Sequence, residues 1–276
     1  MADRGEEEVK LLSIGVALAV LGSPALHSQD DGLPPWVLTL SKIKRQAKAE
    51  LQRTPNYSCL ETIDRSQKLP GAQPFKPLDT LRIEVAFIDG KELFAPQGAG
   101  QFQDVDLSAF MSGGSLGTGA FTSVARNLFV NSGGLTTGSG EEKLGDRATI
   151  WYGYKMPELS NAYRLQGPGG EAYVGEEGRF WVDANSLELL RIEDRAVDIP
   201  EYLRIRDVTT AIVYGKVQIG PSPVLLPRMA ETLVTDADGH QDRNVTEFTN
   251  CREYRSESLI RFGPDDSDTK PPVKKK

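Results

Sequence analysis

The sequence predicts an α+β fold that is dominated by antiparallel β-structure. One long segment near the start has helical periodicity, and about ten later segments alternate between apolar and polar residues. Short polar turns join neighbouring segments, which favours antiparallel pairing, because parallel strands need a crossover of a dozen or more residues. We therefore expect a single antiparallel sheet system with little helix.

The composition narrows the functional classes that suit this chain. Its 276 residues fit one large domain, and 39% hydrophobic with 26% charged residues is ordinary for a folded protein. The net charge of -7 argues against nucleic acid as a partner. The chain has only two histidines, His27 and His240, so histidine-based catalysis and metal binding are not expected. We predict no cofactor and no metal site.

Residues 1–28 are predicted to be a cleaved signal peptide. The uncharged stretch Leu11–Ala25, about fifteen residues long, is shorter than the roughly twenty of a membrane span and typical of a signal-peptide core. The acidic residues 1–8 do not suit the basic start of such a peptide, so we expect translation to begin at Val9, which leaves Lys10 as the basic residue. The alternative is a buried apolar helix. Export predicts a periplasmic or secreted bacterial protein with no transmembrane anchor after cleavage.

The first element of the mature chain is predicted to be an amphipathic helix. Pro34-Pro35 suits the first turn of a helix, and Pro55-Asn56 ends the pattern. One apolar stripe is formed at spacings of three and four by Trp36, Leu40, Ile43, Ala47 and Leu51. We expect this stripe to pack on the sheet.

From Tyr57 onward the hydrophobic period is two, as in half-buried strands. Asp89-Gly90 predicts a tight hairpin turn, because both residues tolerate positive φ angles. Asp236–Gly239 predicts another turn, which makes the neighbouring His240 an exposed loop residue. Besides Tyr57–Leu60, the predicted strands are 81–87, 91–94, 148–154, 162–166, 171–174, 179–182, 187–195, 208–214, 216–219, 229–235, 244–251 and 259–262.

Residues 97–146 are predicted to be a glycine-rich insertion, since they hold 11 of the 27 glycines. A short apolar helix is expected inside it, because Phe121, Val124, Leu128 and Phe129 recur at helical spacing. A lid or plug and an ordinary inserted helix with long loops fit this pattern equally well. The tail at 263–276 has no apolar periodicity and is predicted to be disordered.

The two cysteines are predicted to form a disulfide. Cys59 lies in the first predicted strand and Cys251 in one of the last, and an exported protein with an even cysteine count favours a bridge. The alternative is two buried free thiols.

No catalytic motif is complete, because Ser41-x-x-Lys44 lacks the partner motifs of penicillin-interacting enzymes and no nucleophile pairs with a base. We expect the protein not to be an enzyme.

Two consecutive segments resemble a known hairpin. Arg179–Asp183 and Leu187–Glu193 are similar to the F/V-W-V-D and L-P-L-R-x-E segments of bacterial outer-membrane lipoprotein-sorting proteins (the LolA/LolB type) and their lipid-binding relatives. The first helix and the strand after Leu225–Arg228 are also similar in placement. The resemblance implies a half-open antiparallel barrel over residues 29–262, with a hydrophobic cavity covered by helix. The insertion at 97–146 departs from that family.

The resemblance implies an exported envelope protein that binds a lipid, a lipoprotein acyl chain or another apolar ligand without catalysis. Partner proteins of the envelope are a further expectation. The alternative is a scaffold or interaction domain whose concave side is filled by its own core. The residues expected to line the cavity are Val85, Phe87, Phe121, Val124, Leu128, Phe129, Trp151, Phe180 and Leu189.

Overall fold

The structure is a computed structural model that describes residues 33–71, 74–99, 101–103, 115, 121–131, 134–160 and 163–254. The predicted signal peptide, the strand at 259–262 and the tail at 263–276 lie outside these residues. The compact unit described below begins at Pro35. None of the helices in the described ranges has the length and apolarity that a membrane crossing requires.

The described part of the chain contains one antiparallel sheet of ten strands and a separate two-stranded hairpin. The sheet has two edges, β3 and β4, so it is not closed into a barrel, and the predicted half-open α+β architecture is confirmed. In spatial order its strands are β3 (Lys91–Pro96), β2 (Lys76–Ile88), β1 (Tyr57–Lys68), β12 (Gln241–Glu253), β11 (Ser222–Asp236), β10 (Ile205–Ile219), β9 (Leu189–Val197), β8 (Gly175–Asp183), β5 (Arg147–Met156) and β4 (Leu135–Leu144). The hairpin pairs β6 (Arg164–Gly167) with β7 (Gly170–Tyr173).

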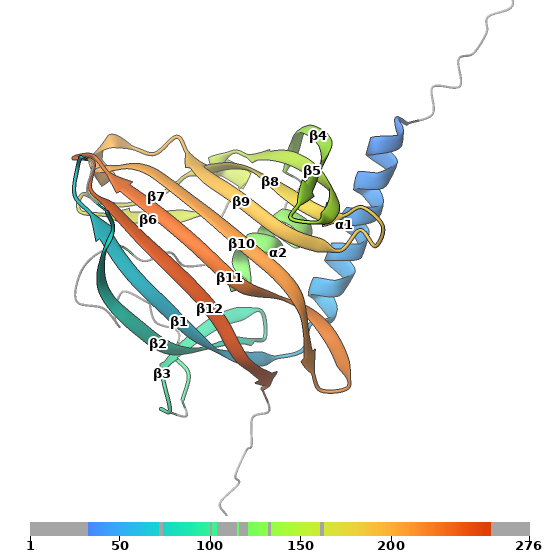
Figure 1. Ribbon diagram of the computed structural model, residues 1–276, viewed down its shortest axis with the longest axis horizontal. Coiled ribbons are helices and arrows are strands. Elements are labelled where there is room, and N and C mark those ends of the chain that lie inside the picture. Colours follow the sequence, from blue (N-terminus) through green and yellow to red (C-terminus); the bar gives the residue numbers. More distant parts are fainter. Residues whose placement is uncertain are drawn as a thin grey trace, which may run out of the picture. The chain divides into compact units, whose positions relative to one another are not determined.

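The helix α1 (Pro35–Arg53) lies beside one end of the long strands (Figure 1). Its buried side chains, Leu40, Ile43, Ala47 and Leu51, are four of the five residues of the predicted stripe. Trp36 is the exception, with 46% of its surface exposed. The other helical segments are short: α2 (Ser123–Arg126), η2 (Asn127–Asn131), η3 (Glu158–Ser160) and η4 (Glu201–Leu203).

The strands that come first and last in the sequence, β1 and β12, pair directly with each other. β1 runs antiparallel to β12, and the pairing shifts by one position between Ser58 and Leu60, where Cys59 lies. The predicted disulfide between Cys59 and Cys251 is confirmed, with 4.1 Å between their Cα atoms. The bridge therefore lies inside the sheet, between its third and fourth strands counted from the β3 edge.

Both predicted turns are confirmed. Asp89 and Gly90 have φ angles of 50° and 86° and join β2 to β3. Gly239 has a φ of 86° in the turn between β11 and β12. The imidazole Nδ1 of His240 lies 3.0 Å from the Asp236 carboxylate on this exposed turn, as expected for a loop histidine.

The strand β4 differs from the sequence prediction, because residues 135–144 were expected inside a flexible insertion. These residues form an edge strand that pairs with β5 along its length. Its glycines have a packing role: a Cβ atom added to Gly140 would lie 2.7 Å from the indole Nε1 of Trp151. Glycine here makes room for an aromatic ring on the neighbouring strand, a known device at sheet edges.

Candidate functional site

The inner face of the sheet, which we define as the face packed on α1, α2 and η2, holds the main hydrophobic core. Seven of the nine predicted lining residues are buried in this core: Val85, Phe87, Phe121, Leu128, Phe129, Phe180 and Leu189. Val124 is partly buried against it. These residues, far apart in the sequence, are therefore brought together on one side of the sheet.

Trp151 is the lining residue that the structure places elsewhere. It neighbours Tyr152, which is buried in the core, and successive side chains of a strand point to opposite faces. Trp151 therefore lies on the outer face, where the Arg179 guanidinium stacks 4.4 Å from the centre of its ring. The sequence pattern could not assign its face, because β5 is apolar on both sides.

The centre of the inner face is filled by residues 121–131, which we call the plug. Phe121 packs between Tyr57 and Phe248, with ring centroids 5.0 and 5.3 Å away. Phe129 meets Phe180 edge to face at 5.1 Å. The cavity beside Phe121 and α1 has a volume of only about 10 Å³, the space of a single water molecule at most. The expected hollow is occupied by the chain itself in this conformation.

Two charged side chains hold the plug in place. One carboxylate oxygen of Glu92, on β3, accepts hydrogen bonds from the backbone N–H and the hydroxyl of Thr122 and of Ser123, at 2.5–3.0 Å. Arg126 donates to the carbonyl oxygen of Leu51 at 2.9 Å, and its guanidinium lies 4.9 Å from the Phe87 ring centre. The plug is thus fixed to the edge strand at its start and to α1 at its middle.

A row of polar residues crosses the inner face next to the apolar centre. Each member lies directly opposite the next one on the neighbouring strand. We call this row the polar belt. From β2 to β5 it consists of Asp79, Arg65, Asn244, Thr232, Thr210, Asp194, Gly178 and Tyr154.

The belt lies between two separate hydrophobic clusters. On the side of the plug, the next inward-facing row contains Ile63, Ile212 and Ile192, which belong to the main core. On the other side, Val208 and Ala196 belong to a smaller cluster under the β6–β7 hairpin. The belt is therefore a polar row between two apolar clusters.

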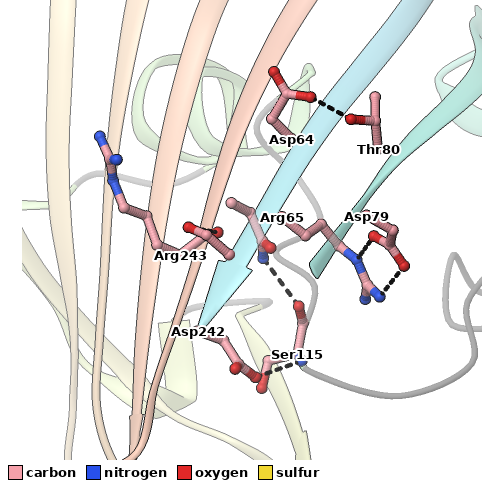
Figure 2. A network of polar contacts seen from close by, with 9 residues as sticks. Asp64, Arg65, Asp79, Thr80, Ser115, Asp242 and Arg243 are labelled. Atoms are coloured by element: carbon pink, nitrogen blue, oxygen red, sulfur yellow. Dashed lines mark hydrogen bonds and ion pairs between the residues drawn. The ribbon is translucent and has the colours of Figure 1, made fainter. Parts of the chain in front are cut away.

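Several belt residues have well-defined partners, some of which are drawn in Figure 2. The buried Arg65 forms a two-pronged ion pair with Asp79, at 2.6 and 2.8 Å. Asn244 donates to the backbone carbonyl of Ser115 at 3.0 Å, and the backbone N–H of Ser115 donates to Asp242 at 2.7 Å. At the other end of the belt, the Tyr154 hydroxyl donates to Glu176 at 2.8 Å.

Other polar atoms of the inner face have no hydrogen-bond partner within the described structure. Two belong to the belt, Oδ2 of Asp194 and Oδ1 of Asn244, although these residues are only 6% and 2% exposed. Two more lie between the belt and the plug, Oε2 of Glu61 and the hydroxyl of Tyr214. Unpaired buried polar atoms cost about 1–3 kcal/mol each, so four on one face is a feature that calls for a functional reason.

Burial controls the protonation of the acids on this face. It raises the pKa of Glu61 to about 8, and the nearby Glu92 carboxylate adds to this effect. Burial also raises the pKa of Asp194 well above its ordinary value, helped by Glu176 and opposed by a hydrogen bond from Thr210. The Glu61 carboxyl group is therefore mostly neutral at neutral pH.

No group of three or more metal-binding side chains occurs among the described residues.

The polar belt was not predicted from the sequence. Its members are single polar residues in mostly apolar inward positions of different strands, and only the strand register aligns them.

Known proteins offer little to compare with this chain. No family model matches the sequence, and no curated protein matches it. Among solved structures, the crystal structure of a DUF1329 family protein from Desulfovibrio piger aligns with 77% of this chain and 90% of its own length. Its sequence identity is 14% and the TM-score is 0.40, so we draw no inference from this likeness.

Proposed function

We propose that this protein is an exported envelope protein that binds an apolar ligand, such as a lipid or an acyl chain, on the inner face of its half-open sheet. Binding is non-catalytic, and the ligand takes the place of the plug. The Cys59–Cys251 bridge supports residence in an oxidising compartment such as the periplasm. The resemblance of the β8–β9 hairpin to lipoprotein-sorting proteins supports the class of ligand.

The observation that supports this proposal most is that the plug is a short segment inserted between two strands and is not itself part of the sheet. The middle of the core is filled by a short segment between β3 and β4, and Phe121, Leu128 and Phe129 of this segment take the space. Burying these three side chains contributes about 5–9 kcal/mol. An acyl chain gains about 0.8 kcal/mol for each buried methylene, so about six to eleven methylenes replace what the plug loses.

The second candidate is an envelope scaffold whose core is permanently filled. The observation that favours it is the cavity of about 10 Å³ beside Phe121 and α1, which leaves no room for a ligand at that position unless the plug moves. The two candidates differ in one measurable property, the ability of the plug to be displaced.

Two experiments test the proposal. The first is organic extraction of the protein purified from a bacterial periplasm, followed by lipid mass spectrometry, which is expected to find a co-purifying lipid.

The second is fluorescence titration with the neutral probe N-phenyl-1-naphthylamine. Glu92→Ala removes the anchor of the plug and is expected to strengthen probe binding about tenfold, since charged hydrogen bonds contribute about 1.5–3 kcal/mol.

The matched control is Glu247→Ala, which removes an exposed carboxylate from β12 and leaves the plug intact. The control is expected to bind the probe as the wild type does. An extract without lipid, together with no saturable probe binding by either the wild type or Glu92→Ala, contradicts the proposal and favours the scaffold.

A further inference from the structure

We infer that the ligand is an amphiphile whose polar end has hydrogen-bond donors and no negative charge, and that the polar belt binds this end. Hydroxyl groups and a primary ammonium group share this chemistry. The inference rests on the proposed function, since it places the apolar tail where the plug lies. It adds the chemical class of the headgroup and the residues that recognise it.

The first argument is the unpaired hydrogen-bonding capacity of the belt. Asp194 and Asn244 each have a side-chain oxygen without a partner in the described structure, and both side chains are more than nine-tenths buried. Oxygen atoms of this kind accept hydrogen bonds. A headgroup that donates hydrogen bonds satisfies the Asn244 oxygen, which only accepts, and also the Asp194 oxygen when this carboxyl group is ionised. A headgroup with acceptors alone leaves the Asn244 oxygen unpaired.

The second argument is the charge of the inner face. Besides the neutral Glu61, three buried or half-buried acids face the interior or the plug: Glu92, Glu176 and Asp194. Arg65 is paired with Asp79, and Arg126 of the plug is engaged with Leu51 and Phe87. A phosphate or carboxylate headgroup would add negative charge next to these acids, which is unfavourable in a buried site.

The third argument is the position of the belt beside the apolar centre. Inward-facing residues that follow one another on a strand are about 7 Å apart, so a headgroup on Thr210 leaves its tail over Ile212. Asn244 and Asp194 are three strand spacings apart, about 14 Å. The hydroxyls of Thr210 and Thr232, 3.4 Å from each other, lie between them. The belt therefore offers a row of hydrogen-bonding groups wide enough for a headgroup with several hydroxyls.

The experiment compares probes that have the same dodecyl tail and different polar ends. Dodecyl maltoside has hydroxyl donors, dodecylamine has an ammonium donor, dodecyltrimethylammonium has positive charge without donors, and dodecanoate is negative. Each probe displaces N-phenyl-1-naphthylamine from the wild-type protein below its critical micelle concentration. We expect the maltoside or the amine to bind at least about tenfold more tightly than dodecanoate and dodecyltrimethylammonium. Which of the two binds more tightly separates a hydroxyl from an ammonium headgroup.

Variants test the belt directly. Asn244→Val and Asp194→Leu each remove an unpaired side-chain oxygen, and each is expected to reduce the preference for the donor-bearing probe about tenfold. Glu193→Gln, on the outer face of the same strand as Asp194, is the matched control and is expected to keep the preference. If a belt variant fails to fold, the probe series on the wild-type protein still decides the question.

The outcomes separate this inference from the proposed function. Equal affinity for all four probes, or tightest binding of dodecanoate, overturns the headgroup assignment and leaves apolar binding in place. Binding of no probe, by the wild type or by the Glu92→Ala variant, overturns both.

Discussion

Glu61 is an acid in a place where its charge is unfavourable. It lies on β1 among core residues, with Glu92 as a charged neighbour, and its pKa is raised from 4.5 to about 8. The unfolded chain releases this proton near pH 4.5, while the folded protein keeps it until about pH 8. The folded state binds more protons in this window, so its stability falls as the pH rises from about 4.5 to about 8.

The first prediction concerns Glu61→Gln, which keeps the shape of the side chain but cannot ionise. The wild type is expected to lose up to about 5 kcal/mol of unfolding free energy through Glu61 across this window, and the variant is expected to lose that much less. Urea unfolding at pH 5 and pH 8 measures the difference. Glu247→Gln is the exposed control. Parallel pH dependence of the wild type and Glu61→Gln would contradict the buried, neutral state of Glu61.

The chemistry of single residues was the part that the sequence predicted least well. Periodicity assigns a residue to the inner or outer face of a strand, and it placed Val85, Phe87 and Phe180 correctly in the core. It does not give the register between strands. Asp194 and Asn244 are 50 positions apart, and only the pairing of four strands aligns them into one belt.

At the scale of elements, the helix and the hairpins follow from the sequence because their signals are local. The stripe of α1 and the turn at Asp89-Gly90 depend on neighbouring residues alone. β4 could not be predicted, because glycine has low β-propensity and a glycine-rich stretch is typical of a loop. The packing of Trp151 over Gly140 is a contact between strands that a local pattern does not contain.

The second prediction tests this account of β4. Gly140→Ala places a methyl group 2.7 Å from the Trp151 indole and is expected to destabilise the protein by about 1–3 kcal/mol, as overpacking does. Gly138→Ala, two positions away on the same strand, meets Trp151 only at 3.8 Å and is expected to change stability by less than about 1 kcal/mol. Thermal unfolding of both variants measures the effects. Equal melting temperatures would show that glycine is not required at position 140.

The whole molecule depends on the pairing of β1 with β12. These two strands are interior neighbours in the sheet, and the Cys59–Cys251 bridge closes a loop of 192 residues between them. The sequence predicted the bridge from compartment and cysteine count, and it predicted the antiparallel class from its short turns. The filling of the inner face could not be predicted in this way, since packing density depends on the shapes of all side chains together.

The third prediction is the loss of stability when the bridge is removed. The Cys59→Ser, Cys251→Ser double variant is expected to lose up to about 5 kcal/mol of unfolding free energy, because a loop of this length strongly restricts the unfolded chain. Urea unfolding at fixed pH measures this loss. The wild type under reducing conditions is expected to unfold at the same urea concentration as the variant. A loss below about 1 kcal/mol would contradict a stabilising role for the bridge.

The position of β12 between β1 and β11 also determines when the sheet can be completed during folding. Synthesis and export both proceed from the N-terminus, so β1 becomes available first and β12 last, and until then β1 has a neighbour on only one side. The strands β1 to β3 form one part of the sheet, and β4, β5 and β8 to β11 form the other. Strand hydrogen bonds connect these two parts of the sheet only after β12, the final strand, has inserted between β1 and β11.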